Sequence, residues 1–145
     1  MKKISAMKIT SVKPDGIPFF VALFGALVAI LGILLGITGL LNPASAVGFI
    51  ENAEMLAGAW AGRTLALGLI TAFALWLRTP QAYTMAFLGC SIREFGDIVG
   101  AFNSGQTGLL PVLFGFFVVD VLCLFLSVRA LQTVINEQSS NPPAS

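Results

Sequence analysis

The segment Ile17–Leu41, IPFFVALFGALVAILGILLGITGLL, runs from end to end without a charged side chain. A helix needs about 20 apolar residues to cross the hydrocarbon core of a bilayer, so this segment is long enough to do so. Pro18 stands at its start, where the missing N–H costs a helix little, and Asn42 with Pro43 ends it. The segment therefore predicts a transmembrane helix.

Three further apolar stretches follow this one, separated by short polar turns. Arg78-Thr79-Pro80 divides the second from the third, and the uncharged sequence NSGQTG (103–108) divides the third from the fourth. We expect an all-α fold, a transmembrane four-helix bundle. Its predicted spans cover about residues 17–41, 56–77, 81–102 and 109–131.

The remaining segments are polar. Residues 1–16 form a basic N-terminal segment, residues 42–55 are a connection that suits a short interfacial helix, and residues 132–145 suggest a disordered tail. The Ala44-Ser45-Ala46 triplet resembles a signal-peptide cleavage site. The preceding apolar run exceeds the usual signal core of about 7–15 residues, so we expect the first span to be retained.

Composition supports a membrane environment and excludes several functions. The chain is 57% hydrophobic and only 10% charged, whereas soluble domains carry about 25% charged residues. The absence of histidine from the sequence excludes Ser-His-Asp and Cys-His catalysis and histidine metal sites. The sequence contains no basic stripe of the kind that would indicate a nucleic-acid partner. It also contains no motif that indicates a cofactor or a metal. Cys90 and Cys123 lack CxxC spacing and are expected to act as small apolar residues, with a redox pair as the alternative.

The distribution of basic residues predicts the orientation. With both termini in the cytoplasm, all of the lysines of the N-terminal segment lie inside, together with Arg78 and Arg129. The only charged residues of the outer loops are then Glu51 and Glu54, and these loops contain no lysine or arginine. By the positive-inside rule we expect a multi-pass protein of the cytoplasmic membrane with its N-terminus and C-terminus inside.

Glycines four residues apart occur on three predicted spans, as Gly32 with Gly36, Gly58 with Gly62, and Gly96 with Gly100. Small residues at this spacing let helix backbones approach closely in lipid. The pattern favours tight packing within one chain, and a homo-oligomer interface is the alternative.

Ionisable residues inside the spans are the candidate functional cluster: Arg63, Arg93, Glu94, Asp97 and Asp120. Each would cost a few kcal/mol if it faced lipid alone, so we expect them to face the interior of the bundle. Arg93 and Asp97 are i,i+4 neighbours on one helix face. Arg63 and Asp97 lie at similar depth and are predicted to form an ion pair, with Asp120 near the level of Glu94.

The charges of this cluster do not balance. Two arginines face three carboxyl groups, which leaves one negative charge in excess. A buried excess charge is costly, so either one carboxyl is protonated or a cation or hydrogen-bond donor completes the cluster. The alternative is that the cluster only holds the helices in register.

One segment carries a family resemblance. Gly62-Arg63-Thr64-Leu65-Ala66-Leu67-Gly68 resembles the start of the second span in a group of four-helix membrane proteins of unknown function, loosely likened to DoxX-like proteins. Asn42-Pro43 with Phe49 and the pair Gly96-Asp97 also resemble that pattern, and the similarity covers about residues 17–131. It implies a four-helix bundle in a bacterial-type cytoplasmic membrane and no particular reaction. Arg63 and Asp97 match recurring polar positions, whereas Arg93-Glu94 departs from them.

Four functions are compatible with these features. The first is a binding or accessory protein that holds a small amphiphile or contacts a membrane protein partner near the cluster. The second is a structural scaffold in which the cluster only joins helices. The third is a membrane enzyme that uses carboxyl acid/base chemistry on a lipid-soluble substrate. The fourth is an oligomeric proton or ion carrier. Of these four, a binding or accessory function is the one that we expect. The sequence does not decide whether the protein is an enzyme.

Overall fold

The computed structural model describes residues 16–42, 54–105 and 107–140. The helices are α1 (Phe19–Leu41), α3 (Glu54–Leu77), α4 (Pro80–Asn103) and α5 (Leu110–Ser140), with the short 3-10 helix η3 (Thr107–Leu109) before α5. Within the described ranges there is no β-strand, so the prediction of an all-α fold with four long helices is confirmed. The expected interfacial helix within 42–55 lies almost entirely outside the described residues, as does most of the N-terminal segment.

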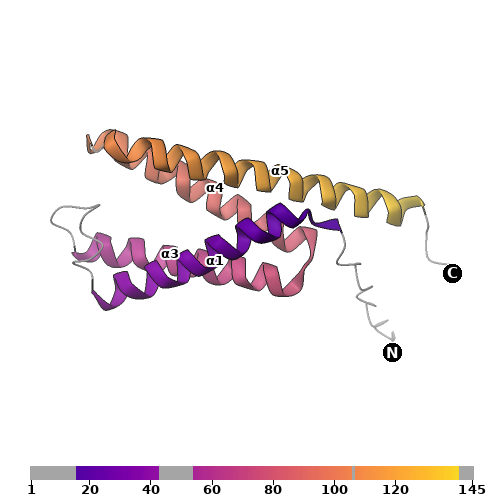
Figure 1. Cartoon of the computed structure of the whole chain (residues 1–145), viewed down its shortest axis with the longest axis horizontal. Coiled ribbons are helices and arrows are strands. Elements are labelled where there is room, and N and C mark those ends of the chain that lie inside the picture. Colours follow the sequence, from indigo (N-terminus) through magenta and orange to yellow (C-terminus); the bar gives the residue numbers. More distant parts are fainter. Residues whose placement is uncertain (1–15, 43–53, 106, 141–145) are drawn as a thin grey trace, which may run out of the picture.

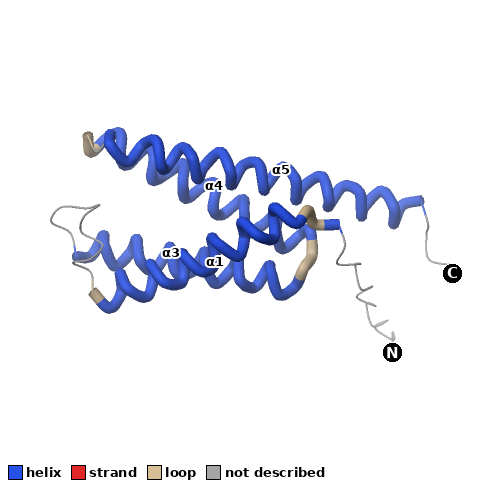
Figure 2. The backbone as a smooth tube through the Cα atoms, viewed as in Figure 1, coloured by secondary structure: helices blue, strands red, loops and turns tan. Residues whose placement is uncertain are grey.

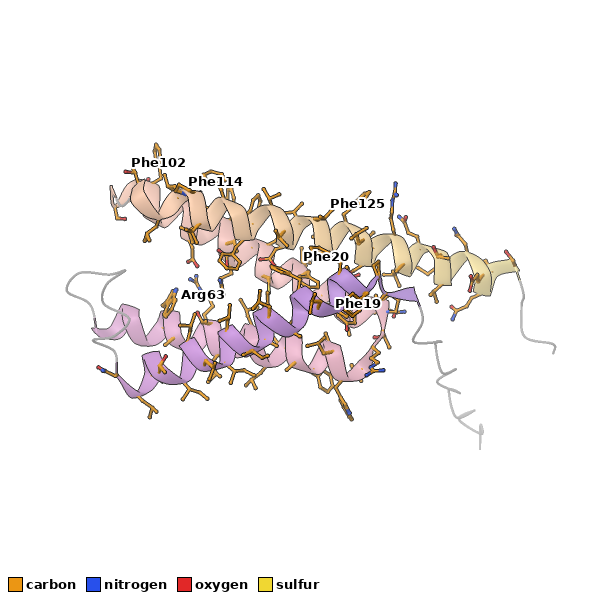
Figure 3. All side chains as sticks on the ribbon, in the orientation of Figure 1. Phe19, Phe20, Arg63, Phe102, Phe114 and Phe125 are labelled. Atoms are coloured by element: carbon orange, nitrogen blue, oxygen red, sulfur yellow. The ribbon has the colours of Figure 1, made fainter. Side chains whose placement is uncertain are left out.

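Three helical segments are long and apolar enough to cross a membrane: Phe19–Leu41, Gly58–Leu77 and Thr107–Ser140. Helix α4 has a comparable length of 24 residues but carries three charged side chains. The outer surface is apolar. Phe102, Phe114 and Phe125 point away from the helices, as Figure 3 shows, and each is at least 50% exposed. These features suggest a membrane protein.

The helices form two antiparallel hairpins, as Figure 1 shows. Helix α1 packs along α3, and α4 packs along α5. The hairpins approach each other at the end where α1 begins and separate toward the end where α1 finishes. Helix α1 makes little contact with α5, so the bundle is closed at one end and splayed at the other.

Glycines hold the first hairpin together. A Cβ atom on Gly68 would lie 2.7 Å from the backbone nitrogen of Ile33, and one on Gly36 would lie 2.5 Å from Cβ of Leu65. The backbones of α1 and α3 therefore touch, as the spacing of Gly32 and Gly36 predicts.

The other two glycine pairs behave differently. A Cβ on Gly58, Gly62, Gly96 or Gly100 would meet no described atom within 4 Å. The prediction that these pairs pack within the chain is therefore wrong for the described residues. A GxxxG spacing provides a flat face on a helix, but a second helix must also lie opposite it.

The closed end has an aromatic core. Val21, Tyr83, Phe87 and Cys123 form one buried cluster from α1, α4 and α5. The rings of Phe24 and Phe87 stack across α1 and α4 with centroids 6.2 Å apart. This packing fixes the two hairpins at one end and leaves their other ends free to separate. Both cysteines are buried free thiols, consistent with an apolar role.

A tight turn joins α3 to α4 (Figure 2). Arg78 has a φ of 52°, which ends α3 in the left-handed region. The Thr79 hydroxyl oxygen then accepts a hydrogen bond of 3.3 Å from the backbone N–H of Ala82, and Pro80 occupies the first turn of α4. The sequence Arg-Thr-Pro thus stops one helix and caps the next.

Replacing Thr79 with alanine should remove this cap and lower the free energy of unfolding by about 0.5–2 kcal/mol. Thermal unfolding of the detergent-solubilised protein would measure the loss. Thr133→Ala is the matched control, because the exposed Thr133 hydroxyl donates only to the Arg129 carbonyl within its own helix. Equal stability of the two variants would contradict the capping role.

Helix α5 is longer than expected. It continues through Ser140, past the predicted end of the span at Leu131, so the prediction of a disordered tail is wrong for residues 132–140. That segment contains neither glycine nor proline, and the first proline after it is Pro142. The 31 residues of helix α5 span about 46 Å at about 1.5 Å per residue. This length is more than the hydrocarbon thickness of a bilayer, which is about 30 Å.

Candidate functional site

Helix α4 supplies three of the expected cluster residues on adjoining positions of one turn. Arg93 Nη2 donates a hydrogen bond to Glu94 Oε1. Arg93 Nε also lies 3.6 Å from Asp97 Oδ2, an ion pair between the i,i+4 neighbours that the sequence places on one helix face. Arg93 is therefore placed between two carboxylates of its own helix.

A second arginine joins this group from α3. Arg63 Nη2 donates to Asp97 Oδ1 over 2.5 Å, which confirms the predicted Arg63–Asp97 ion pair. Figure 3 shows Arg63 on α3 near the splayed end of the bundle. The Arg63 side chain is 45% exposed and that of Asp97 is 19% exposed. This ion pair links the two hairpins where their backbones separate.

Glu94 and Asp120 lie deeper, and each is only 2% exposed. Glu94 has the Arg93 guanidinium beside it. Asp120, from α5, forms no hydrogen bond and no ion pair with any residue in the described ranges. An unpaired polar group away from water is energetically costly, so the position of Asp120 calls for a partner.

Both carboxyl groups line a cavity of about 100 Å³ between the hairpins. Its polar wall comes from Thr64 on α3, Arg93 and Glu94 on α4, and Asp120 on α5. Each of these side chains has one buried atom without a hydrogen-bond partner among the described groups, namely Thr64 Oγ1, Arg93 Nε, Glu94 Oε2 and Asp120 Oδ1. Since a single water needs only about 10–15 Å³ of such space, the cavity can hold several waters or a small head group.

The other residues that line the cavity are mostly apolar. Helix α1 contributes Val28, Leu31, Gly32 and Leu35, and rings come from Trp60 on α3 and Phe116 on α5. Leu31 and Leu35 are also 37% and 49% exposed on the outer surface. The cavity thus reaches the face of α1 that would contact lipid, beside the helix α5 with which α1 barely packs.

The structure divides the predicted cluster into two parts. Arg93, Glu94 and Asp120 line the cavity, whereas Arg63 and Asp97 form an ion pair beside it and are not part of its lining. Sequence reasoning missed Thr64 as a wall residue. Thr64, Gly68 and Thr71 are all buried on one face of α3, and this spacing of small and polar residues was the available signal.

Thr64, Glu94 and Asp120 offer oxygen atoms to a bound group and Arg93 offers N–H donors, so the arrangement can hold a hydrogen-bonding molecule. Within the described part of the chain, no three histidine, cysteine, aspartate or glutamate side chains gather as a set of metal ligands.

Comparisons with protein-family models, with curated proteins and with solved structures find no match to this chain. The fold therefore defines a broad class, a helical protein with three segments apolar enough to cross a membrane. The resemblance to four-helix, DoxX-like proteins stays a sequence-based prediction.

Proposed function

We propose that the chain crosses the cytoplasmic membrane four times, with α4 as the remaining span and both termini inside. Helix α4 has 24 residues, or about 36 Å, enough for a bilayer. One of its faces carries exposed apolar side chains at helical spacing along its whole length: Met85, Leu88, Ile92, Phe95, Val99 and Phe102. Its charged residues occupy the other face, toward the cavity and Arg63. This division allows a charged helix to cross lipid.

We further propose that the protein binds a small amphiphile in the cavity between its hairpins. The observation that carries this proposal is that four side chains from three helices line one cavity, and that each has one buried polar atom without a hydrogen-bond partner among the described groups. Native proteins satisfy nearly all of their buried polar groups, and exceptions concentrate where a ligand or water binds. The apolar wall beside Leu31 and Leu35 suits the hydrocarbon part of such a ligand.

A purely structural cluster explains less of this geometry. The Arg63–Asp97 ion pair connects α3 to α4, and the Arg93–Glu94 pair neutralises a buried carboxylate. Asp120, however, forms no hydrogen bond or ion pair that would join α5 to another described residue. A buried carboxyl group that bonds to no other helix costs desolvation free energy and does not help to fix the register of the helices. A bound head group would give this carboxyl group a partner.

Mass spectrometry of small molecules extracted from the purified protein tests this proposal. We expect a defined amphiphile on the wild type at about one per chain, and at least tenfold less on Asp120→Asn. The expected loss follows because a hydrogen bond to a charged group contributes about 1.5–3 kcal/mol, equivalent to a factor of ten or more in affinity.

Glu137→Gln is the control for this experiment. It also converts an acid of α5 to an amide, but Glu137 is exposed and outside the cavity. It should retain the molecule in full. Bulk lipid alone, in equal amounts on all three proteins, would contradict the proposal and favour the structural interpretation.

A further inference from the structure

We propose that the cavity selects amphiphiles whose head group is a protonated amine, with Asp120 as the counter-ion. This inference rests on the proposed binding function and adds the chemical class of the ligand. Arg63 pairs with Asp97 and Arg93 with Glu94, so each guanidinium of the cluster already has a carboxylate, and Asp120 is the cluster's carboxyl group without an arginine partner among the described residues.

In the described ranges, the groups around Asp120 do not supply the missing cation. Helix α1 presents only apolar residues and a glycine to the cavity, and α3 presents Trp60 and Thr64. Helix α4 presents Cys90, Glu94 and Arg93, and the Arg93 guanidinium is within ion-pair distance of Glu94 and Asp97 rather than of Asp120. A ligand that brings a positive charge would therefore complete the cluster, whereas an anion would add to the excess.

The oxygen atoms of the wall match the donors of an ammonium group. Thr64 Oγ1, Glu94 Oε2 and Asp120 Oδ1 are all buried, all without a partner, and come from three different helices around one cavity. A primary ammonium has three N–H donors and no acceptor. A wall that offers three acceptor side chains therefore suits an ammonium head group better than a hydroxyl head group, which has a single donor.

The rest of the cavity suits the remainder of such a molecule. The rings of Trp60 and Phe116 border the cavity, and aromatic faces attract cations within about 6 Å. The volume of about 100 Å³ admits a head group but no long chain. A hydrocarbon tail would leave past Leu31 and Leu35, toward lipid.

The test uses the full chain in phosphatidylcholine nanodiscs with three isotope-labelled probes of equal chain length: dodecylamine, dodecanol and dodecanoate. Binding to nanodiscs without protein is subtracted as the blank, which removes partitioning into lipid. We expect dodecylamine to saturate at one per chain and to bind at least tenfold more tightly than either other probe. Asp120→Asn should abolish this preference, and Glu137→Gln should keep it.

The outcomes separate this inference from the function on which it rests. If dodecanol or dodecanoate binds as tightly as dodecylamine, amphiphile binding stands and the selection for amines is overturned. If no probe binds above the blank and no defined molecule copurifies, both proposals are overturned. Should Asp120→Asn fail to fold, the order of the three probes on the wild type still decides, and Glu94→Gln serves as the second variant.

Discussion

Replacing Arg93 with methionine is expected to destabilise the protein by about 3–5 kcal/mol, because it removes one partner of a buried ion pair. The side chain of Glu94 is only 3% exposed, and the Arg93 guanidinium is its ion-pair partner. Without Arg93 the carboxylate would remain buried and unpaired, and Asp97 would retain only Arg63. Reversible unfolding in mixed detergent micelles would measure this loss as a lower free energy of unfolding.

A second substitution tests the cause of this loss. Adding Glu94→Gln to Arg93→Met removes the isolated charge, so the double variant should recover a large part of the lost stability. Arg129→Met is the control, since Arg129 is exposed and stacks over the Phe125 ring at 4.6 Å instead of joining the cluster. If Arg93→Met were as stable as the wild type, the Arg93–Glu94 ion pair would make no contribution to the free energy of unfolding, and the prediction would be wrong.

Replacing Gly68 with alanine is expected to force α1 and α3 apart. The added Cβ would lie 2.7 Å from the Ile33 backbone nitrogen and 2.8 Å from the Gly32 carbonyl carbon. Backbone atoms cannot turn away as a flexible side chain can, so the helices must separate. Overpacking of this kind typically costs about 1–3 kcal/mol, and more where the surroundings are rigid.

Gly115→Ala on α5 isolates the packing effect from helix propensity. Gly115 is exposed, and a Cβ there would meet no described atom within 4 Å. In that position alanine should stabilise the helix by up to about 1 kcal/mol relative to glycine. The two Gly→Ala variants should therefore shift the unfolding midpoint in opposite directions, and a shift of the same sign would contradict the close contact between α1 and α3.

The amino-acid sequence by itself determined the helices and where most of them end. Long apolar runs favour helices because a bilayer satisfies no backbone hydrogen bonds, and the breaks at Asn42-Pro43 and Arg78-Thr79-Pro80 are local features. The Arg63–Asp97 ion pair was also predictable. Charges inside apolar helices have few partners to choose from, and helical geometry places these two at similar depth.

Only the tertiary structure decided which helices form hairpins and which glycines touch. Gly32, Gly36, Gly58 and Gly62 have the same spacing in the sequence, yet only the first two meet another backbone among the described atoms. A local pattern shows which face of a helix can pack closely. Which face does so depends on a second helix from elsewhere in the chain.

The cavity is a tertiary feature for the same reason. Thr64, Glu94 and Asp120 come from three helices, and only the packing of those helices shows that each has a buried oxygen without a partner among the described groups. The sequence shows that the cluster contains one more carboxyl group than arginines, but it does not show which carboxyl group lacks an arginine partner. The packing leaves Asp120 as the carboxyl group of the cluster without an arginine partner in the described ranges, because both arginines lie within ion-pair distance of the carboxylates of α4.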